Sequence, residues 1–255
     1  MNSLLLALMA DSGNQSWFDK TKDDFVNNFI TDDRYMYIVN GLKITLQVTF
    51  FALLLGIVLG IIMAIIRSTH DKTVATMRPG IGKFLLKVLN AIAQVYLTVV
   101  RGTPVVVQLM IAYYIIFAAS NNKVGIAILA FGINSGAYVA EIIRSGIMSI
   151  DNGQFEAGRS LGFNYAQTMI YIIIPQAFKN VLPALANEFI VLLKETSVSG
   201  YVGLQDMSRG GDIIRSRTYS AFMPLIAVAI IYLVIVMFFS KLVAILERRL
   251  RNNER

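Results

Sequence analysis

The sequence predicts an all-α membrane protein with about five transmembrane helices. Hydrophobic residues make up 56% of its 255 positions and charged residues only 15%, a balance that soluble domains seldom reach. Several apolar runs are long enough to cross about 30 Å of hydrocarbon. In such a protein the net charge of +7 indicates basic ends facing anionic lipid, and nucleic-acid binding is not expected.

The first 38 residues are predicted to form an extracytoplasmic segment. Residues 1–10 are apolar but carry no lysine or arginine, so an amphiphilic stub at the membrane surface fits them better than a secretory signal peptide. Residues 11–34 are rich in acids, with a short helix expected around 25–30.

The first span is expected over residues 39–66, which as a helix would extend about 42 Å. Gly56 and Gly60 give it a small-residue face that lets a neighbouring helix come close. Residues 67–87 are strongly basic, so the positive-inside rule places them in the cytoplasm and the N-terminus outside. Pro79 and Gly80 should end any helix there.

Residues 84–100 are apolar, but dispersed polar side chains favour a helix at the inner membrane interface over a crossing. Pro104 disfavours helical geometry in the residue before it, so a break is expected there. The second crossing is then expected over residues 105–119, and the third over 124–143.

The fourth crossing is expected over residues 181–193, after Pro183, followed by a polar connection over 196–218 and a last span over 221–246. A membrane domain over 39–247 would thus precede a cytoplasmic basic tail, 248–255.

Three arginines in the predicted outer connection oppose this topology, and two acids offset them in part. The arginines are Arg209, Arg215 and Arg217, and the acids are Asp206 and Asp212.

No catalytic or metal site is expected in this chain. Residues 80–83 read Gly-Ile-Gly-Lys, but Phe84 follows where a P-loop has serine or threonine. The sequence has no cysteine and one histidine, His70, expected to be solvated. Any ATP-driven activity would therefore need another polypeptide to hydrolyse the ATP.

A charged, glycine-punctuated segment over residues 149–175 separates two predicted spans. Asp151 can cap a short helix that runs to about Leu161. Gly158 and Gly162 permit a close backbone approach and a sharp turn. Such a helix fits a cleft in a soluble partner, and an ordinary interfacial helix is the alternative.

The spacing of this segment resembles the EAA loop of ATP-binding cassette (ABC) importer permeases: Glu-Ala-Ala, three residues, Gly, nine residues, Ile-x-Leu-Pro. Here Gly158 replaces the second alanine and Ile174 the leucine. The resemblance implies a helix that couples to an ATPase. The coupling residues it implies are Glu156, Ala157, Gly158, Arg159, Leu161 and Gly162.

Short motifs across residues 40–246 resemble the polar amino-acid uptake subgroup of these permeases, which imports histidine, arginine, lysine, glutamine, glutamate, cystine or opines. The motifs are RGTP at 101–104 before Val107-Gln108, Tyr113-Tyr114, NSGAY at 134–138, AEIIR at 140–144, NEFI at 187–190 and LKETS at 193–197.

The resemblance implies a type I ABC importer fold in the bacterial cytoplasmic membrane. It also implies the partners: a second permease subunit, identical or homologous, two ATPase subunits that bind ATP and magnesium, and an extracytoplasmic amino-acid-binding protein.

Charged groups inside spans are candidates for the substrate pathway, because one near the bilayer centre costs about 2.5–3.5 kcal/mol. Glu188, beside Asn187, can pair with a substrate ammonium, and a structural hydrogen bond or salt bridge is an equal alternative. Glu141 and Arg144 are three apart and are expected to pair, with a structural role favoured over gating.

The remaining pathway candidates are uncharged. Gln108 can line a pathway or bond between helices. Tyr113 and Tyr114 can be interfacial aromatics or close over a ligand. Asn134 lies in a small polar patch that favours helix packing over ligand contact.

An ATP-independent secondary transporter or channel is the main competing function, although no inverted hydropathy repeat supports it. The composition would also suit an assembly subunit that lines no pathway. An ABC permease for another small solute would share the coupling segment and differ only in what it carries.

Overall fold

The computed structural model describes residues 17–252, within which every regular element is a helix. The elements are α2 (Trp17–Phe25), η1 (Val26–Ile30), η2 (Thr31–Asp33), α3 (Tyr35–Thr73), α4 (Ile81–Gly102), α5 (Val105–Ile111), η3 (Ala112–Ile116), α6 (Lys123–Met148), α7 (Asn152–Ser160), α8 (Tyr165–Thr168), η4 (Met169–Ile173), α9 (Ile174–Glu195), η5 (Thr196–Val202), α10 (Met207–Thr218) and α11 (Phe222–Asn252). The stub expected over residues 1–10 and the last three residues of the tail lie outside the described range.

Five helical stretches are long and apolar enough to cross a membrane. They are Tyr35–Thr73, Ile81–Gly102, Lys123–Met148, Tyr165–Val202 and Phe222–Leu250. The expected all-α fold with about five transmembrane helices is therefore confirmed.

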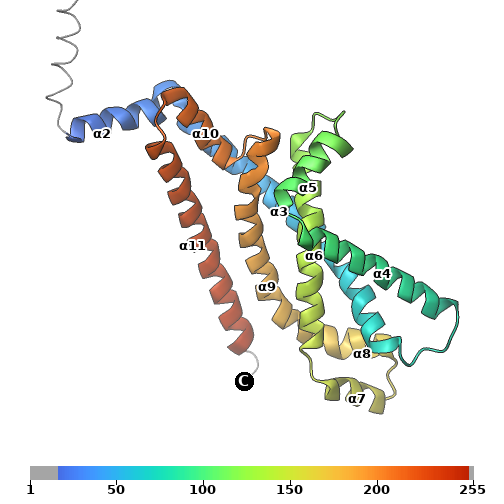
Figure 1. The fold of residues 1–255 in the computed structure, drawn as a ribbon. Coiled ribbons are helices and arrows are strands. Elements are labelled where there is room, and N and C mark those ends of the chain that lie inside the picture. Colours follow the sequence, from blue (N-terminus) through green and yellow to red (C-terminus); the bar gives the residue numbers. More distant parts are fainter. Residues whose placement is uncertain (1–16, 253–255) are drawn as a thin grey trace, which may run out of the picture.

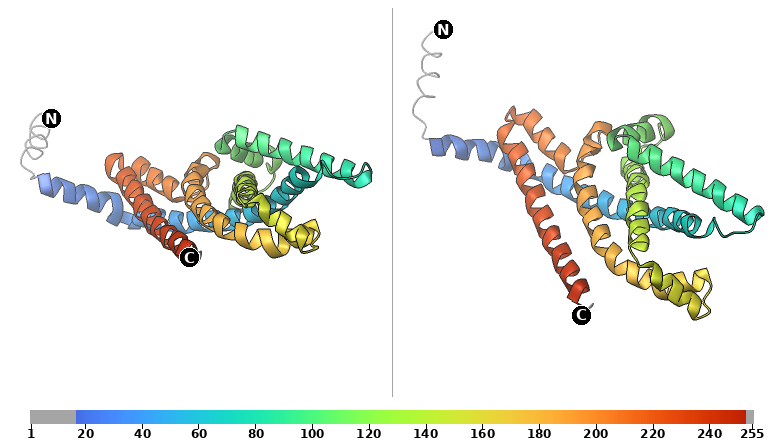
Figure 2. Two further views of the ribbon diagram at one scale, coloured as in Figure 1. Left: turned by 90° about the horizontal axis from the view of Figure 1, so that it is seen from below. Right: turned by 60° about the horizontal axis from the view of Figure 1, so that its bottom comes forward.

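The long helices run between two ends of the molecule (Figures 1 and 2). We call them the α7 end, which carries α7, and the α2 end, which carries α2 and the α10–α11 turn. α3, α6 and α11 run toward the α7 end, and α9 runs back from it (Figure 1).

The second membrane crossing differs from the one expected over residues 105–119. Residues 84–100 belong to α4, which is long and apolar enough to cross, whereas residues 105–116 form only a short apolar helix. That helix extends about 18 Å, too little for a hydrocarbon core of about 30 Å. α4 and α5 lead in succession from the α7 end toward the α2 end, so they share one passage (Figure 1). Thr103 and Pro104 separate them in extended conformations.

Most of the other expected spans are shorter than the helices observed, because apolar residues mark only the middle of a membrane-spanning helix. α3 and α6 each extend beyond the expected spans at both ends. α9 begins at Ile174, inside the expected loop, and holds Pro183 in its interior. The connection expected over 196–218 is mostly helical, as η5 and α10.

α3 and α6 form the most extensive helix pair in the described chain. The backbone of Gly56 lies against Ser135, where an added Cβ would come within 3.0 Å of the serine side chain. Gly60 lies closer still to Val139. The two glycines thus allow the close approach that their spacing predicts.

Candidate functional site

α7 lies across the α7 end between α6 and α8 (Figure 1). It begins after Asp151, whose Oδ1 accepts a hydrogen bond from the Gly153 N–H (2.6 Å) in the expected N-cap. Phe155 and Gly158 are its two buried residues. Phe155 packs with Ile173 in an apolar cluster under the helix.

Gly158 is the point of closest approach between α7 and α8. A Cβ at this position would lie 2.6 Å from the Thr168 hydroxyl, so a larger residue would force the helices apart. The small size of this residue, which departs from the EAA pattern, is therefore required by packing.

The end of α3 also holds α7. Lys72 Nζ donates to Asn152 Oδ1 (2.8 Å) and lies 4.6 Å from the centre of the Phe155 ring. Because this contact joins distant parts of the chain, no local pattern in the sequence predicts it.

The remaining predicted coupling residues are exposed on the α7 end: Glu156, Ala157, Arg159, Leu161 and Gly162. Leu161 is 70% exposed, so its side chain is accessible to a partner. No ion pair joins Glu156 and Arg159 in the described chain, so both charges are open to a partner. Gly162 turns the chain toward α8 with a φ of 82°, a left-handed conformation that favours glycine.

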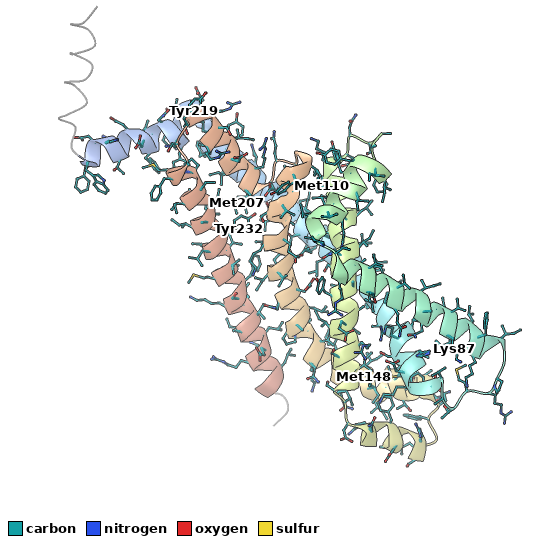
Figure 3. All side chains as sticks on the ribbon, viewed as in Figure 1. Lys87, Met110, Met148, Met207, Tyr219 and Tyr232 are labelled. Atoms are coloured by element: carbon teal, nitrogen blue, oxygen red, sulfur yellow. The ribbon has the colours of Figure 1, made fainter. Side chains whose placement is uncertain are left out.

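A cavity of about 480 Å³ lies between α6 and α9. It is lined by Arg101, Tyr138, Glu141, Ile142, Ser145, Gly146, Ser149, Asn180, Ala184 and Glu188. Its lining reaches Ser149, next to Met148 at the α7 end, far from Tyr219 at the α2 end (Figure 3). Two of the predicted pathway residues, Glu141 and Glu188, thus share one cavity.

Glu188 is a buried carboxylate, only 7% exposed. Its Oε1 accepts a hydrogen bond from Ser135 Oγ (2.8 Å), which bridges α9 and α6. Asn187 is exposed and does not line the cavity, because neighbouring residues on a helix point about 100° apart.

Glu141 pairs with Arg144 as predicted, at 2.7 Å. Arg144 also lies 3.6 Å from Asp71 of α3, and Arg101 at the end of α4 lies 4.0 Å from Glu141. The predicted local pair is therefore part of a network that joins three helices beside the cavity.

The uncharged pathway candidates lie elsewhere. Gln108 Nε2 donates to Val100 O (2.7 Å) and to Thr103, while its Oε1 accepts from Asn134 Nδ2 (3.0 Å). The Gln108 amide thus braces the break between α4 and α5 against α6. The Tyr114 hydroxyl donates to Tyr201 O (3.1 Å).

Tyr113 packs partly buried against the apolar cluster around Leu109. Neither tyrosine lines the cavity.

Five polar lining residues were not among the predicted pathway residues: Arg101, Tyr138, Ser145, Ser149 and Asn180. In the sequence Arg101 marks a helix break, although a charge inside an apolar stretch is itself a signal of a functional site. Tyr138 ends the NSGAY motif, which did not mark it as a lining residue, and no sequence signal distinguishes Asn180.

The known proteins that this chain resembles belong to membrane transport systems. Residues 80–252 match the family described as "Binding-protein-dependent transport system inner membrane component". The arginine transport system permease protein ArtQ of Bacillus subtilis (strain 168) is 37% identical over 86% of this chain and 94% of its own length. The glutamine transport system permease protein GlnP of Escherichia coli (strain K12) is 38% identical over 64% of this chain and 77% of its own.

Solved structures agree. An amino acid ABC transporter crystallised with histidines is 42% identical, with a TM-score of 0.75 over 87% of this chain and 98% of that chain. The MetNI methionine ABC transporter in an inward-facing conformation has a TM-score of 0.70 over 85% of this chain and 97% of that chain. At 19% identity the latter likeness concerns the fold alone.

Proposed function

The chain belongs to the family of binding-protein-dependent transport system inner membrane components, as a permease subunit of an ABC importer, and we propose that it carries a polar amino acid. The named relatives that transport arginine and glutamine support this solute class. They do not favour a secondary transporter, a channel or a permease for an unrelated solute.

The docking of an ATPase on α7 is the step on which this function depends. One observation carries it: a short helix anchored from below by Phe155 and Gly158 presents Leu161 and unpaired charges outward. A helix supported rigidly on one face can transmit the movement of a partner seated on the other face. We call the exposed residues Glu156, Ala157, Arg159, Leu161 and Gly162 the coupling surface.

The assembly would contain two permease subunits, two ATPase subunits and an external amino-acid-binding protein. ATP and magnesium would bind to the ATPase subunits, because this chain has no P-loop. This chain would be the non-catalytic, multi-pass subunit in the cytoplasmic membrane.

The α7 end would face the cytoplasm. Basic residues near this end support that orientation: Arg67, Lys72, Arg78, Lys83, Arg248 and Arg249. At the α2 end, Arg209 and Arg215 both pair with Asp212, and Arg217 lies over the Tyr37 ring, 5.1 Å from its centre. Each of these three arginines thus has a partner within the protein, while the larger number of basic residues near the α7 end supports the orientation.

The division of the chain follows from this orientation. Residues 1–38 would be extracytoplasmic, 39–247 would form the permease domain and 248–255 a cytoplasmic tail.

The cavity between α6 and α9 would be part of the pathway. Glu188 and Glu141 supply negative charge to the cavity, and Arg101 supplies positive charge. This combination suits an amino acid whose side chain carries a second positive charge. Asn187, which is exposed on α9, would complete the pathway only in the permease dimer. Gln108, Asn134, Tyr113 and Tyr114 would support the helices that surround it.

A charge placed on the coupling surface tests this function. In Leu161→Asp we expect co-purified ATPase and binding-protein-stimulated ATP hydrolysis to fall about tenfold or more, because a buried leucine contributes about 1.5–3 kcal/mol. Tyr219→Asp, which adds the same charge at the opposite end where Tyr219 is 96% exposed, is the control. Equal ATPase recovery in the two variants would refute docking at α7.

A further inference from the structure

α2 is an unusual helix because none of its residues is buried, yet it carries large aromatic side chains. Trp17 is 71% exposed, Phe18 74% and Phe25 51%. A group of large aromatic side chains exposed on one helix marks a surface that contacts a membrane or a protein.

The aromatic residues define one face of this helix. Phe18, Phe25 and Phe29 are spaced by seven and four residues, which places them on one side. The rings of Phe25 and Phe29 are in contact, with centroids 5.1 Å apart. Asp23 lies on the far side of the helix, about 140° from Phe18, and Asp19 on its flank, about 100° from Phe18.

The orientation of that face follows from Phe29. Phe29 is buried in the cluster with Ile38, Met207, Ile214 and Val228, which are residues of α3, α10 and α11. The side of α2 that carries Phe18 and Phe25 is in line with Phe29 and therefore faces the membrane-spanning helices. The side that carries Asp23 faces away from these helices.

α2 also points in a particular direction. It projects sideways from the α2 end, across the direction of α9 and α11, and meets α3 at an angle (Figure 1). α11 begins close by with exposed apolar residues, among them Phe222 at 75% and Leu225 at 47%. The aromatic face of α2 thus continues an apolar surface of the spans.

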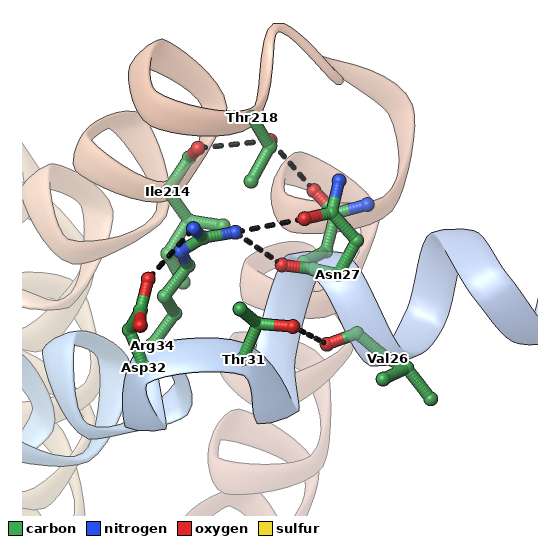
Figure 4. Close-up of polar contacts among 8 residues, drawn as sticks. Val26, Asn27, Thr31, Asp32, Arg34, Ile214 and Thr218 are labelled. Atoms are coloured by element: carbon green, nitrogen blue, oxygen red, sulfur yellow. Dashed lines mark hydrogen bonds and ion pairs between the residues drawn. The ribbon is translucent and has the colours of Figure 1, made fainter.

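A hydrogen-bonded turn between η1 and α3, which we call the elbow, fixes the direction of α2 (Figure 4). Asp32 and Asp33 both have positive φ values, 55° and 50°, which turn the chain sharply before α3. The Arg34 guanidinium donates to the backbone and side-chain oxygens of Asn27 and to Asp32 Oδ2 (2.9 Å).

The elbow is also joined to α10. Asn28 is fully buried, and its Oδ1 accepts a hydrogen bond from Thr218 Oγ1 (2.8 Å). Its Nδ2 donates to Asp24 O (2.7 Å), which joins η1 to α2. α2 is therefore held at a set angle to α10.

We propose that α2 is a membrane-surface anchor whose aromatic face, with Trp17, lies in the headgroup region of the lipid leaflet at the α2 end. Tryptophan and other aromatic residues favour this region, and an amphipathic helix lies there with its apolar side about 5–10 Å deep. Lys20 and Lys22 nearly balance the acids of α2, so a zwitterionic lipid suffices. That this leaflet is the outer one depends on the proposed orientation.

Trp17 is the single tryptophan of the chain, so its fluorescence reports on α2 alone. The full chain would be placed in phosphatidylcholine nanodiscs with bromine near the headgroups or near the bilayer centre. We expect blue-shifted Trp17 emission and roughly twofold stronger quenching by the shallow bromine, as for an interfacial helix. Phe18→Ser with Phe25→Ser should reduce this quenching, whereas Asp19→Ser with Asp23→Ser should leave it in place.

Trp17 emission that no brominated lipid quenches would overturn the anchor. So would emission that shifts only when the binding protein is added, because the aromatic face would then belong to a protein partner. A separate measurement concerns the leaflet. Asp19→Cys in this cysteine-free chain should react with an impermeant thiol reagent from outside right-side-out vesicles. Reaction only from inside would overturn the proposed orientation and leave the lipid contact standing.

Discussion

Glu188 carries a negative charge and accepts a hydrogen bond from Ser135, and two substitutions can remove these two features one at a time. In Glu188→Gln an oxygen still accepts from Ser135, but the negative charge in the cavity is lost. We expect uptake of a cationic amino acid to fall about tenfold more than uptake of a neutral one, equivalent to about 1.4 kcal/mol. Competing uptake of radiolabelled arginine and glutamine into proteoliposomes measures the ratio.

Ser135→Ala is the matched control, because it removes the hydrogen bond and keeps the charge. It should lower both uptake rates together. If Glu188→Gln also lowers the two rates equally, Glu188 is a structural residue, the alternative that its sequence context leaves open.

Asp206 illustrates a different residue-scale effect, outside the spans. Its carboxylate caps α10 by accepting from the Ser208 and Arg209 N–H groups, and burial raises its pKa to about 6. Because the folded pKa exceeds the unfolded one of about 3.9, folding favours the neutral acid. This stability is full below about pH 4 and is lost as the pH rises through about 6.

We therefore expect Asp206→Asn, which can still cap α10, to be less destabilised by rising pH than the parent. Between about pH 5 and pH 7.5 the parent should lose roughly 1–1.5 kcal/mol that the variant keeps. Recovery of monodisperse protein after heating measures this difference.

Asp212→Asn serves as the control for pH. The hydrogen bond from Arg215 lowers the pKa of Asp212, so this carboxyl stays ionised throughout the range. Its replacement should shift stability equally at both pH values. An Asp206→Asn profile parallel to the parent's would contradict the raised pKa.

At the scale of the element, α7 and its turn form one unit. Gly162 has a φ of 82° and open space where a Cβ would be. Gly162→Val should therefore strain the turn by about 1–2 kcal/mol without a clash and displace the coupling surface. We expect stimulated ATP hydrolysis to become uncoupled from uptake while membrane insertion stays normal.

Gly80→Val is a suitable control, because Gly80 also has open space but an extended φ of 166°. It should leave both activities unchanged. Normal coupling in Gly162→Val would show that the turn's geometry is not needed by the ATPase.

The break between α4 and α5 shows why one element was misplaced by sequence. Pro104 predicted the break correctly, but hydropathy alone did not show that the helices on its two sides share a passage. Gln108 makes this possible inside a span, because its amide bonds the free carbonyls of Val100 and Thr103. Left unpaired away from water, a carbonyl of this kind costs about 1–3 kcal/mol.

At the scale of the whole molecule, the topology is the main prediction. The chain has no cysteine, so single thiols at Ser160 and Tyr219 report on the two ends. In right-side-out vesicles, an impermeant reagent should label Tyr219→Cys and should label Ser160→Cys only after the vesicles are opened. Labelling of Ser160→Cys from outside would place α7 on the wrong side for an ATPase.

The sequence by itself determined the membrane class, the helical fold and the motif that marks α7, because apolar length and residue spacing are local properties of a chain. It also predicted the N-cap and the turn of α7, and it singled out Glu141 and Glu188 as candidates for the pathway. The exact ends of the spans were not determined, because polar residues at helix ends are stabilised by neighbours that hydropathy does not include.

Only the tertiary structure decided which of these residues meet. It brought Glu141 and Glu188 into one cavity with Arg101, and it set Lys72 of α3 against Asn152 and Phe155 of α7. It also turned α2 away from α3 through Arg34 and Asn28. Contacts of this kind depend on how helices pack across long sequence separations, and a single sequence carries no periodic signal for them.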